Sequence, residues 1–187
     1  MLDLWLVRHA ESLGNLDGTA SDTELSELGV GQARTLRHLL ADTAFATVWA
    51  SPLRRAMQTA ALALPGVAPV VDPRLTELQS SRTPTFVDTS NPVELQRLLQ
   101  SAPLTSESGK DFMARVGEWR NALPPEGSVI AFTHFGVVRE IIALLLGFRR
   151  APQSMGYAAV FRFAVRGDAV DIVAWNHTPS EGPASAD

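Results

Sequence analysis

The chain has 187 residues, of which 45% are hydrophobic and 19% charged, and its formal net charge is −4. This balance is typical of one soluble globular domain, and the negative charge argues against nucleic acid or an anionic membrane as the main partner. The chain has no cysteine, which excludes disulfides, thiolate metal sites and cysteine nucleophiles.

The N-terminal apolar run is too short for a signal-peptide core, because it ends at Arg8 and no basic region precedes it. No stretch approaches the roughly 20 apolar residues of a membrane span. We therefore expect a cytoplasmic protein.

The first part of the chain alternates strand and helix patterns. Residues 2–7 form an apolar run typical of a buried strand, and a polar loop follows. Ser26 is placed to cap a helix that extends to about residue 40. After a second strand at 46–50, Ser51 and the proline behind it predict the start of a helix that ends near residue 64.

The same alternation continues to the end of the chain. We expect, in order, a short strand within 65–71, an irregular segment at 78–105 with one helix at 92–100, a helix at 108–123, a strand at 128–132, a helix at 137–146, a hairpin of strands at 157–165 and 169–175, and a disordered tail at 179–187. Strands that alternate with helices predict an α/β fold with a mostly parallel sheet.

Two histidines follow directly on predicted strands, where ligands bind in such sheets. His9 follows the first strand and has Arg8 beside it, and His134 follows the fourth strand and precedes a turn with Gly136. His38 within a helix and His177 near the C-terminus are expected to have surface roles.

Two histidines and a carboxylate could also bind zinc or iron. However, neither His-x-x-x-His nor His-Glu-x-x-His spacing occurs, and the guanidinium of Arg8 would repel a cation. A guanidinium donates paired hydrogen bonds to phosphate oxygens, so a phosphate site is favoured and neither a metal nor a cofactor is expected.

Residues 6–12 (LVRHAES), followed by Asn15, resemble the opening motif of the histidine phosphatase superfamily, which includes the cofactor-dependent phosphoglycerate mutases. Further segments resemble that family in order and spacing: 25–29 (LSELG), 32–33 (QA), 51–60 (SPLRRAMQTA), 75–77 (LTE), 107–108 (ES) with 115–116 (RV), 133–139 (THFGVVR) and Asn176. The resemblance implies a three-layer α/β/α sandwich of the phosphoglycerate mutase type. It also implies one domain over residues 1–178 with a short cap segment at 78–105.

The resemblance also implies roles for these residues. His9 would carry the phosphoryl group, Glu77 would act as the general acid, and the phosphate would be held by Arg8, Asn15, Arg55 and His134. A neutral imidazole can attack phosphorus and so split one difficult transfer into two easier ones. Oriented donors would stabilise the charge on the phosphoryl oxygens of the transition state.

Glu11 is the alternative candidate for the general acid, because it lies two residues after His9. We expect it instead to form an ion pair with an arginine such as Arg8 or Arg55. Arg54 is expected to be solvated or ion-paired.

Two further arginines lie beyond the second motif. Arg139 is expected to make an ion pair or to orient a site loop. Arg82 is expected to be an exposed loop charge, and the alternative is a contact with the far end of a substrate.

Two departures from the family pattern favour hydrolysis over mutase chemistry. The Gly-x-Trp-Glu-Gly stretch that follows the acid in the mutases is replaced by residues 78–84 (LQSSRTP), and the Gly-Arg element after the motif's asparagine is missing. A phosphohistidine should therefore meet water, and the expected substrate is a small phosphorylated metabolite. The alternatives are a phosphoglycerate mutase, a protein phosphohistidine phosphatase and a non-catalytic phosphate-binding module. The sequence is also compatible with a homodimer.

Overall fold

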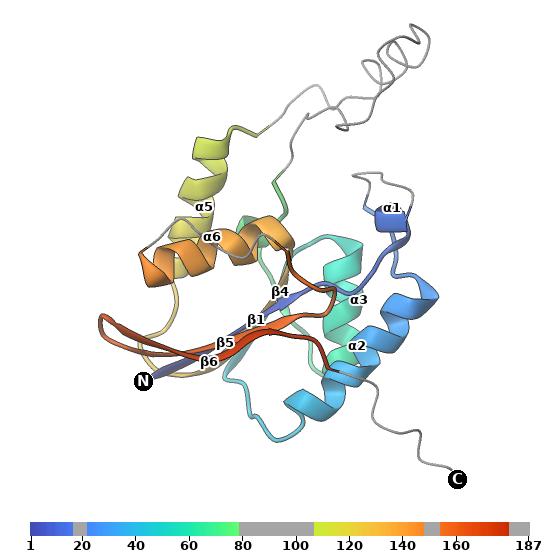
Figure 1. Ribbon diagram of the computed structural model, residues 1–187, viewed down its shortest axis with the longest axis horizontal. Helices are drawn as coiled ribbons and strands as arrows, with labels where there is room; N and C mark the ends of the chain where they lie inside the picture. Colours follow the sequence, from blue (N-terminus) through green and yellow to red (C-terminus); the bar gives the residue numbers. More distant parts are fainter. Residues whose placement is uncertain (17–21, 79–106, 148–153, 180–187) are drawn as a thin grey trace, which may run out of the picture.

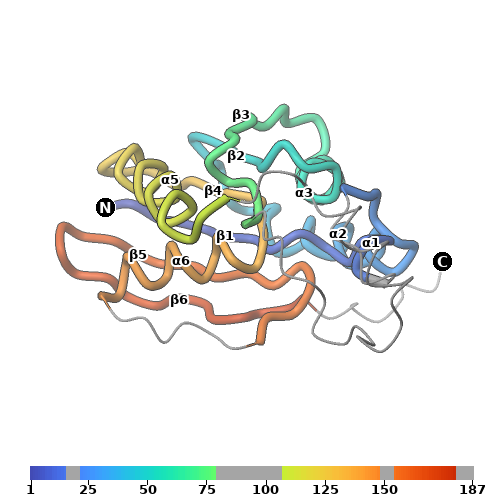
Figure 2. Tube along the Cα trace, turned by 90° about the horizontal axis from the view of Figure 1, so that it is seen from above, coloured from blue at the N-terminus to red at the C-terminus, as the bar shows by residue number. Residues whose placement is uncertain are grey.

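The computed structural model describes residues 1–16, 22–78, 107–147 and 154–179. Its sheet has six strands in the order β3-β2-β4-β1-β5-β6, which can be followed from top to bottom in Figure 2. The strands are β1 (Leu2–Arg8), β2 (Thr47–Ala50), β3 (Val70–Val71), β4 (Gly127–Thr133), β5 (Val160–Arg166) and β6 (Ala169–His177). The helices are α1 (Leu13–Leu16), α2 (Glu27–Leu40), α3 (Arg54–Ala63), the 3-10 helix η1 (Pro73–Leu75), α5 (Gly109–Asn121) and α6 (Phe135–Leu146).

The sheet is parallel in its first part and antiparallel at one edge. Strands β3, β2, β4 and β1 pair in parallel, whereas β5 pairs antiparallel with β1 and β6 pairs antiparallel with β5. The mostly parallel sheet and the terminal hairpin are thus confirmed. The hairpin turns at Gly167, whose φ of 59° is one that glycine adopts without strain.

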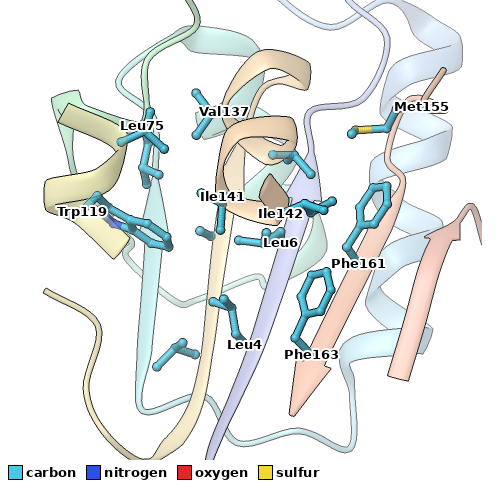
Figure 3. Close-up of a cluster of buried hydrophobic side chains, with 14 of the residues drawn as sticks. Leu4, Leu6, Leu75, Trp119, Val137, Ile141, Ile142, Met155, Phe161 and Phe163 are labelled. Atoms are coloured by element: carbon cyan, nitrogen blue, oxygen red, sulfur yellow. The ribbon is translucent and has the colours of Figure 1, made fainter. Parts of the chain in front are cut away.

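Helices cover both faces of the sheet, with α5 and α6 on one side and α2 and α3 on the other (Figure 1). Strand β1 shows why, because its side chains alternate between the faces. Leu4 and Leu6 pack with α5 and α6, as Figure 3 shows for the first of two buried clusters. Trp5 and Val7 belong to the second cluster, with α2 and α3. Full burial of one such side chain contributes about 1.5–3 kcal/mol, and the three-layer sandwich follows from burial on both faces.

The start of α3 differs from the prediction. The helix begins at Arg54, and its N-cap residue Leu53 makes no side-chain capping bond. The carboxylate of Asp22 instead accepts the N–H of Arg54 at 2.7 Å. Ser51, the predicted cap, accepts the N–H of Leu53 at 3.3 Å but is not the N-cap residue.

Two other boundaries shift because the chain turns near the strand ends. Helix α6 begins at Phe135 with His134 as its N-cap residue, ahead of the predicted start at 137. Strand β5 begins at Val160 instead of residue 157, because Ala158 has a φ of 54° and interrupts an extended run.

Several predictions fall outside the described residues. They are the helix at 92–100, all of the cap segment except residue 78, and the tail beyond residue 179. Within the described ranges, no helix is both long enough and apolar enough to cross a membrane.

Candidate active site

Three adjacent parallel strands deliver polar side chains to one edge of the sheet. His9 follows β1, His134 follows β4 and Ser51 follows β2. Backbone bonds align these ends: the N–H of His9 donates to the carbonyl of Thr133 at 2.8 Å, and that of Ser51 to the carbonyl of Phe132 at 2.9 Å. The ring centroids of His9 and His134 lie 5.1 Å apart, so the structure brings the two predicted histidines together.

His9 presents one unprotonated ring nitrogen to Arg55. Its Nδ1 lies 2.7 Å from the carbonyl oxygen of Ala10, which can only accept, so Nδ1 carries the proton. Nε2 then accepts a bond from Nε of Arg55 at 3.3 Å. Burial lowers the pKa of His9 to about 3, and the charges of Arg55 and Arg8 act in the same direction. The ring is therefore neutral at physiological pH, as a nucleophile must be.

Arg8 is held beside His9 by the segment that precedes β5. Its Nη1 donates to the carbonyl of Met155, and its Cζ lies 4.1 Å from the centroid of the Tyr157 ring. Its Nε is buried and has no hydrogen-bond partner among residues that the structure describes. A buried donor of this kind is a natural contact for an anion.

Asn176 supports the segment that holds Arg8. Its side-chain oxygen accepts the backbone N–H of Gly156 at 3.1 Å, and its own φ is 49°, a conformation that asparagine tolerates better than most residues. The position that resembles the family's asparagine thus acts on Arg8 through the backbone of residues 155–157.

Arg55 lies in the first turn of α3 and is buried. Thr59 ties this turn to the loop behind His9, because its hydroxyl donates to the carbonyl of Arg55 at 2.7 Å and accepts the N–H of Ala10 at 3.0 Å. Within the described ranges, the nearest carboxylate to the Arg55 guanidinium is that of Asp22, at 3.7 Å. Such a long contact leaves the guanidinium available to a phosphate.

Glu77 lies close to both arginines. Burial lowers the pKa of Arg8 and of Arg55, and the charge of Glu77 raises both in part. The Glu77 carboxylate accepts the N–H of Leu78 at 2.9 Å and that of Gly136 at 3.1 Å. Backbone donors thus hold the candidate acid near Arg8 and Arg55.

Arg115 secures the backbone that carries Glu77. It forms an ion pair with Glu107 at 2.5 Å and donates to the carbonyl of Arg74 at 2.7 Å and to that of Glu77 at 3.5 Å. The family-like residues Glu107 and Arg115 therefore position the segment that carries the candidate acid.

His134 is completely buried, and its Nε2 lies 2.7 Å from the hydroxyl oxygen of Ser51. Burial and the positive charge of its neighbours lower its pKa well below the ordinary value. Its Nδ1 is buried and lacks a hydrogen-bond partner in the described part of the chain.

Asn15 is exposed, and its side-chain oxygen accepts from the N–H of Ser12 at 3.1 Å and from its hydroxyl at 2.7 Å. Only its amide N–H groups could therefore serve a phosphate.

Glu11 does not pair with Arg8 or Arg55, so that expectation is wrong. Its carboxylate accepts the hydroxyl of Ser26 at 2.7 Å, at the N-terminus of α2, where the helix dipole favours negative charge. The backbone of Glu11 also packs against Gly29, where an added Cβ would lie 2.0 Å from its carbonyl oxygen. The loop behind His9 is thereby fixed to α2.

The remaining charged residues that the sequence singled out have other surroundings or fall outside the described residues. Arg54 is exposed and pairs with Glu24 at 2.7 Å, as expected. Arg139 lies over the ring of Phe135 at 5.8 Å and has no ion pair within the described residues, and Arg82 falls outside them. His38 and His177 are exposed. In the described ranges, no three His, Asp or Glu side chains are grouped so that they could hold a metal ion.

Comparison with known proteins agrees with this geometry. The model of the histidine phosphatase superfamily (branch 1) matches residues 4–178. The chain belongs to this family.

Relatives within the histidine phosphatase superfamily cover parts of the chain. The adenosylcobalamin/alpha-ribazole phosphatase of Salmonella typhi is 36% identical over 129 residues, which are 66% of this chain but only 57% of that protein. A probable phosphoglycerate mutase of Yersinia pestis is 37% identical over 84 residues, 42% of this chain and 39% of that protein. The structure of a candidate alpha-ribazole-5'-P phosphatase from Escherichia coli has a TM-score of 0.74 at 23% identity and covers 95% of this chain and 98% of its own, which supports the shared fold.

The sequence did not predict two residues of this candidate site. Ser51 directly follows a predicted strand, as both histidines do, so the same rule could have placed it at the site. Tyr157 lies against Arg8, and its ring centroid is 6.1 Å from that of His9. No sequence signal places Tyr157 there, because its contact depends on how β5 enters the sheet.

Proposed function

We propose that this protein hydrolyses the phosphomonoester of a small metabolite through a phosphohistidine on His9. The observation that carries this proposal is the contact of His9 Nδ1 with the carbonyl oxygen of Ala10, which holds the ring proton on Nδ1. A neutral imidazole with its proton held at Nδ1 directs its Nε2 lone pair toward Arg55. This arrangement suits attack on a phosphorus atom whose oxygens are bound by guanidinium groups.

Binding of a phosphate replaces the bond between Arg55 and Nε2 of His9, and Arg8, Arg55 and His134 then donate to phosphoryl oxygens. Nε2 forms a bond to phosphorus as the bond from phosphorus to the leaving oxygen breaks. Protonated Glu77 gives its proton to that oxygen. The donors act by preorganised electrostatics on a loose transition state.

Water completes the cycle. Glu77, now a carboxylate, takes a proton from a water molecule whose oxygen attacks phosphorus. The bond between phosphorus and Nε2 breaks, inorganic phosphate leaves, and His9 returns to its neutral form with the proton still on Nδ1.

The names of the relatives suggest the first substrate to test. Alpha-ribazole 5'-phosphate is the proposed substrate, because alpha-ribazole phosphatases match this chain over most of the folded domain. Phosphoglycerate mutase activity is the second candidate, since the Yersinia relative bears that name. Hydrolysis is favoured over it because the residues after Glu77 lack the mutase stretch.

A panel assay tests this proposal. The purified protein is incubated with alpha-ribazole 5'-phosphate, sugar phosphates, nucleotides, phosphoglycerates and phosphohistidine peptides, and release of inorganic phosphate is measured. Rapid quench should trap an acid-labile, base-stable phosphoryl group on His9, and the His9→Ala variant should be folded and inactive. Labelling of His134 instead, or conversion of phosphoglycerates without phosphate release, would contradict the proposal.

A further inference from the structure

We infer that Ser51 is a positioning residue that sets the tautomer of His134, so that Nδ1–H of His134 donates to the substrate phosphate. This inference rests on the proposed function, since it assigns a donor to the same phosphate pocket. Ser51 and His134 are both completely buried, and the hydroxyl oxygen of Ser51 lies 2.7 Å from Nε2 of His134. One proton lies between these two atoms, and whether the oxygen or Nε2 carries it decides whether Nδ1 donates or accepts a hydrogen bond.

The other bond of the Ser51 hydroxyl leaves its proton available to His134. The oxygen accepts the backbone N–H of Leu53 at 3.3 Å. A hydroxyl has one proton to donate, and in this contact it is free to go to Nε2 of His134. Because the ring is neutral, an Nε2 that accepts requires the ring proton on Nδ1.

The opposite side of the ring leads to the same assignment. Nδ1 of His134 and Nε of Arg8 are buried atoms without hydrogen-bond partners among the described residues. Nε of arginine is always a donor, and a phosphate dianion offers acceptors only. The charge of Arg8 acts on His134, so the two groups are neighbours. A phosphate in contact with both atoms would satisfy them if Nδ1 carries a proton, whereas an unprotonated Nδ1 would repel the phosphate oxygens as a second acceptor.

The sheet register makes the contact rigid. Ala50 of β2 lies opposite Phe132 of β4, and the N–H of Ser51 donates to the carbonyl of Phe132. Ser51 and His134 are therefore attached to the ends of paired strands. A donor held in this way requires little reorganisation when charge develops on the phosphate.

The tautomer can be measured directly on the full-length, ¹⁵N-labelled protein. Long-range ¹H–¹⁵N NMR of the wild type should show Nε2 of His134 without a proton and Nδ1 with one. Ser51→Ala should move the proton partly or fully to Nε2, and Ser51→Thr, which keeps the hydroxyl, should retain the wild-type pattern. An NMR titration with inorganic phosphate should show binding weakened about tenfold or more in Ser51→Ala and near normal in Ser51→Thr.

Ser108→Ala is the matched control, because it removes a serine hydroxyl that caps α5 at an exposed site. It should change neither the His134 spectrum nor phosphate binding. A wild-type spectrum with the proton on Nε2 would overturn the inference, and so would Ser51→Ala with unchanged tautomer and affinity. If Ser51→Ala does not fold, the wild-type and Ser51→Thr spectra decide the question.

These readouts need no turnover, so they separate this inference from the proposed function. If the panel assay finds no hydrolysis but His134 has the expected tautomer and phosphate binds, only the proposed function is rejected. Turnover with the proton on Nε2 would reject only the role of Ser51.

Discussion

The backbone amide of Gly136 donates to Oε2 of Glu77 at 3.1 Å, and this contact holds the candidate acid at the N-terminus of α6. The approach depends on glycine, because a Cβ at residue 136 would lie 2.3 Å from Oε1 of Glu77. The motif around His134 therefore serves two parts of the proposed mechanism: His134 contacts the phosphate, and Gly136 places the acid.

Gly136→Ala should displace the Glu77 carboxylate while leaving the phosphate ligands in place. We expect kcat on an alkyl phosphate to fall about 10²-fold, because acid catalysis contributes about 10²–10⁴-fold. Affinity for inorganic phosphate should change little. Gly117→Ala is the matched control, since an added Cβ there meets nothing within 4 Å. Equal losses in the two variants would mean that Gly136 matters only for folding.

Glu77→Gln should discriminate between leaving groups. The departing p-nitrophenolate is a stable anion and needs little protonation, whereas an alkoxide needs a proton as it leaves. In a burst experiment that isolates phosphorylation of His9, the variant should lose about 10²–10⁴-fold on an alkyl phosphate and far less on p-nitrophenyl phosphate. Should Glu11→Gln show this pattern in place of Glu77→Gln, the acid is Glu11.

Activity on p-nitrophenyl phosphate should survive dialysis against EDTA. Arginines occupy the place that a cation would take beside the phosphoryl oxygens, so the proposed chemistry does not require a Lewis acid. The assay compares initial rates before and after chelation and after addition of Mg²⁺ or Zn²⁺. Loss of activity that either ion restores would show that a metal takes part.

The free energy of unfolding should decrease as the pH is lowered, because the buried histidines bind protons when the protein unfolds. Burial lowers the pKa of His9 from its ordinary value of 6.5 to about 3 in the folded protein, and the pKa of His134 is shifted in the same direction. Between these values the unfolded state binds more protons, so the free energy of unfolding decreases as the pH falls from 6.5 toward 3. Each histidine contributes at most about 1.4 kcal/mol per pH unit.

Urea unfolding between pH 4.5 and 7.5, in buffer without phosphate, measures this slope. His9→Asn should reduce this slope by about one bound proton, and His38→Asn, on the exposed side of α2, is the matched control. An unaltered slope in His9→Asn would show that His9 is not kept neutral by burial.

Much of the fold could be predicted because its signals are local. The apolar run of β1 and the helical spacing of α2 and α5 appear within single segments, and all three elements form where expected. The observed ends of helices differ from the predicted ends where a tertiary contact replaces a local one. Helix α3 begins at Arg54 because the distant side chain of Asp22 satisfies its first N–H.

The candidate site divides in the same way. The sequence by itself determined that His9 and His134 follow strands, that Arg8 lies beside His9, and that Arg55 and Glu77 lie in family motifs. Each of these is a property of residue type and nearby spacing.

Only the tertiary structure decided how these residues are held. Glu11 bonds to Ser26 instead of an arginine, and Ser51 meets His134 across 83 positions of the chain. The direction of a side chain depends on which strands pair and on which donors burial leaves unsatisfied. The Ser51 hydroxyl accepts the N–H of Leu53 and also bonds to a buried imidazole, whose nitrogen would otherwise lose its hydrogen bond to water without replacement.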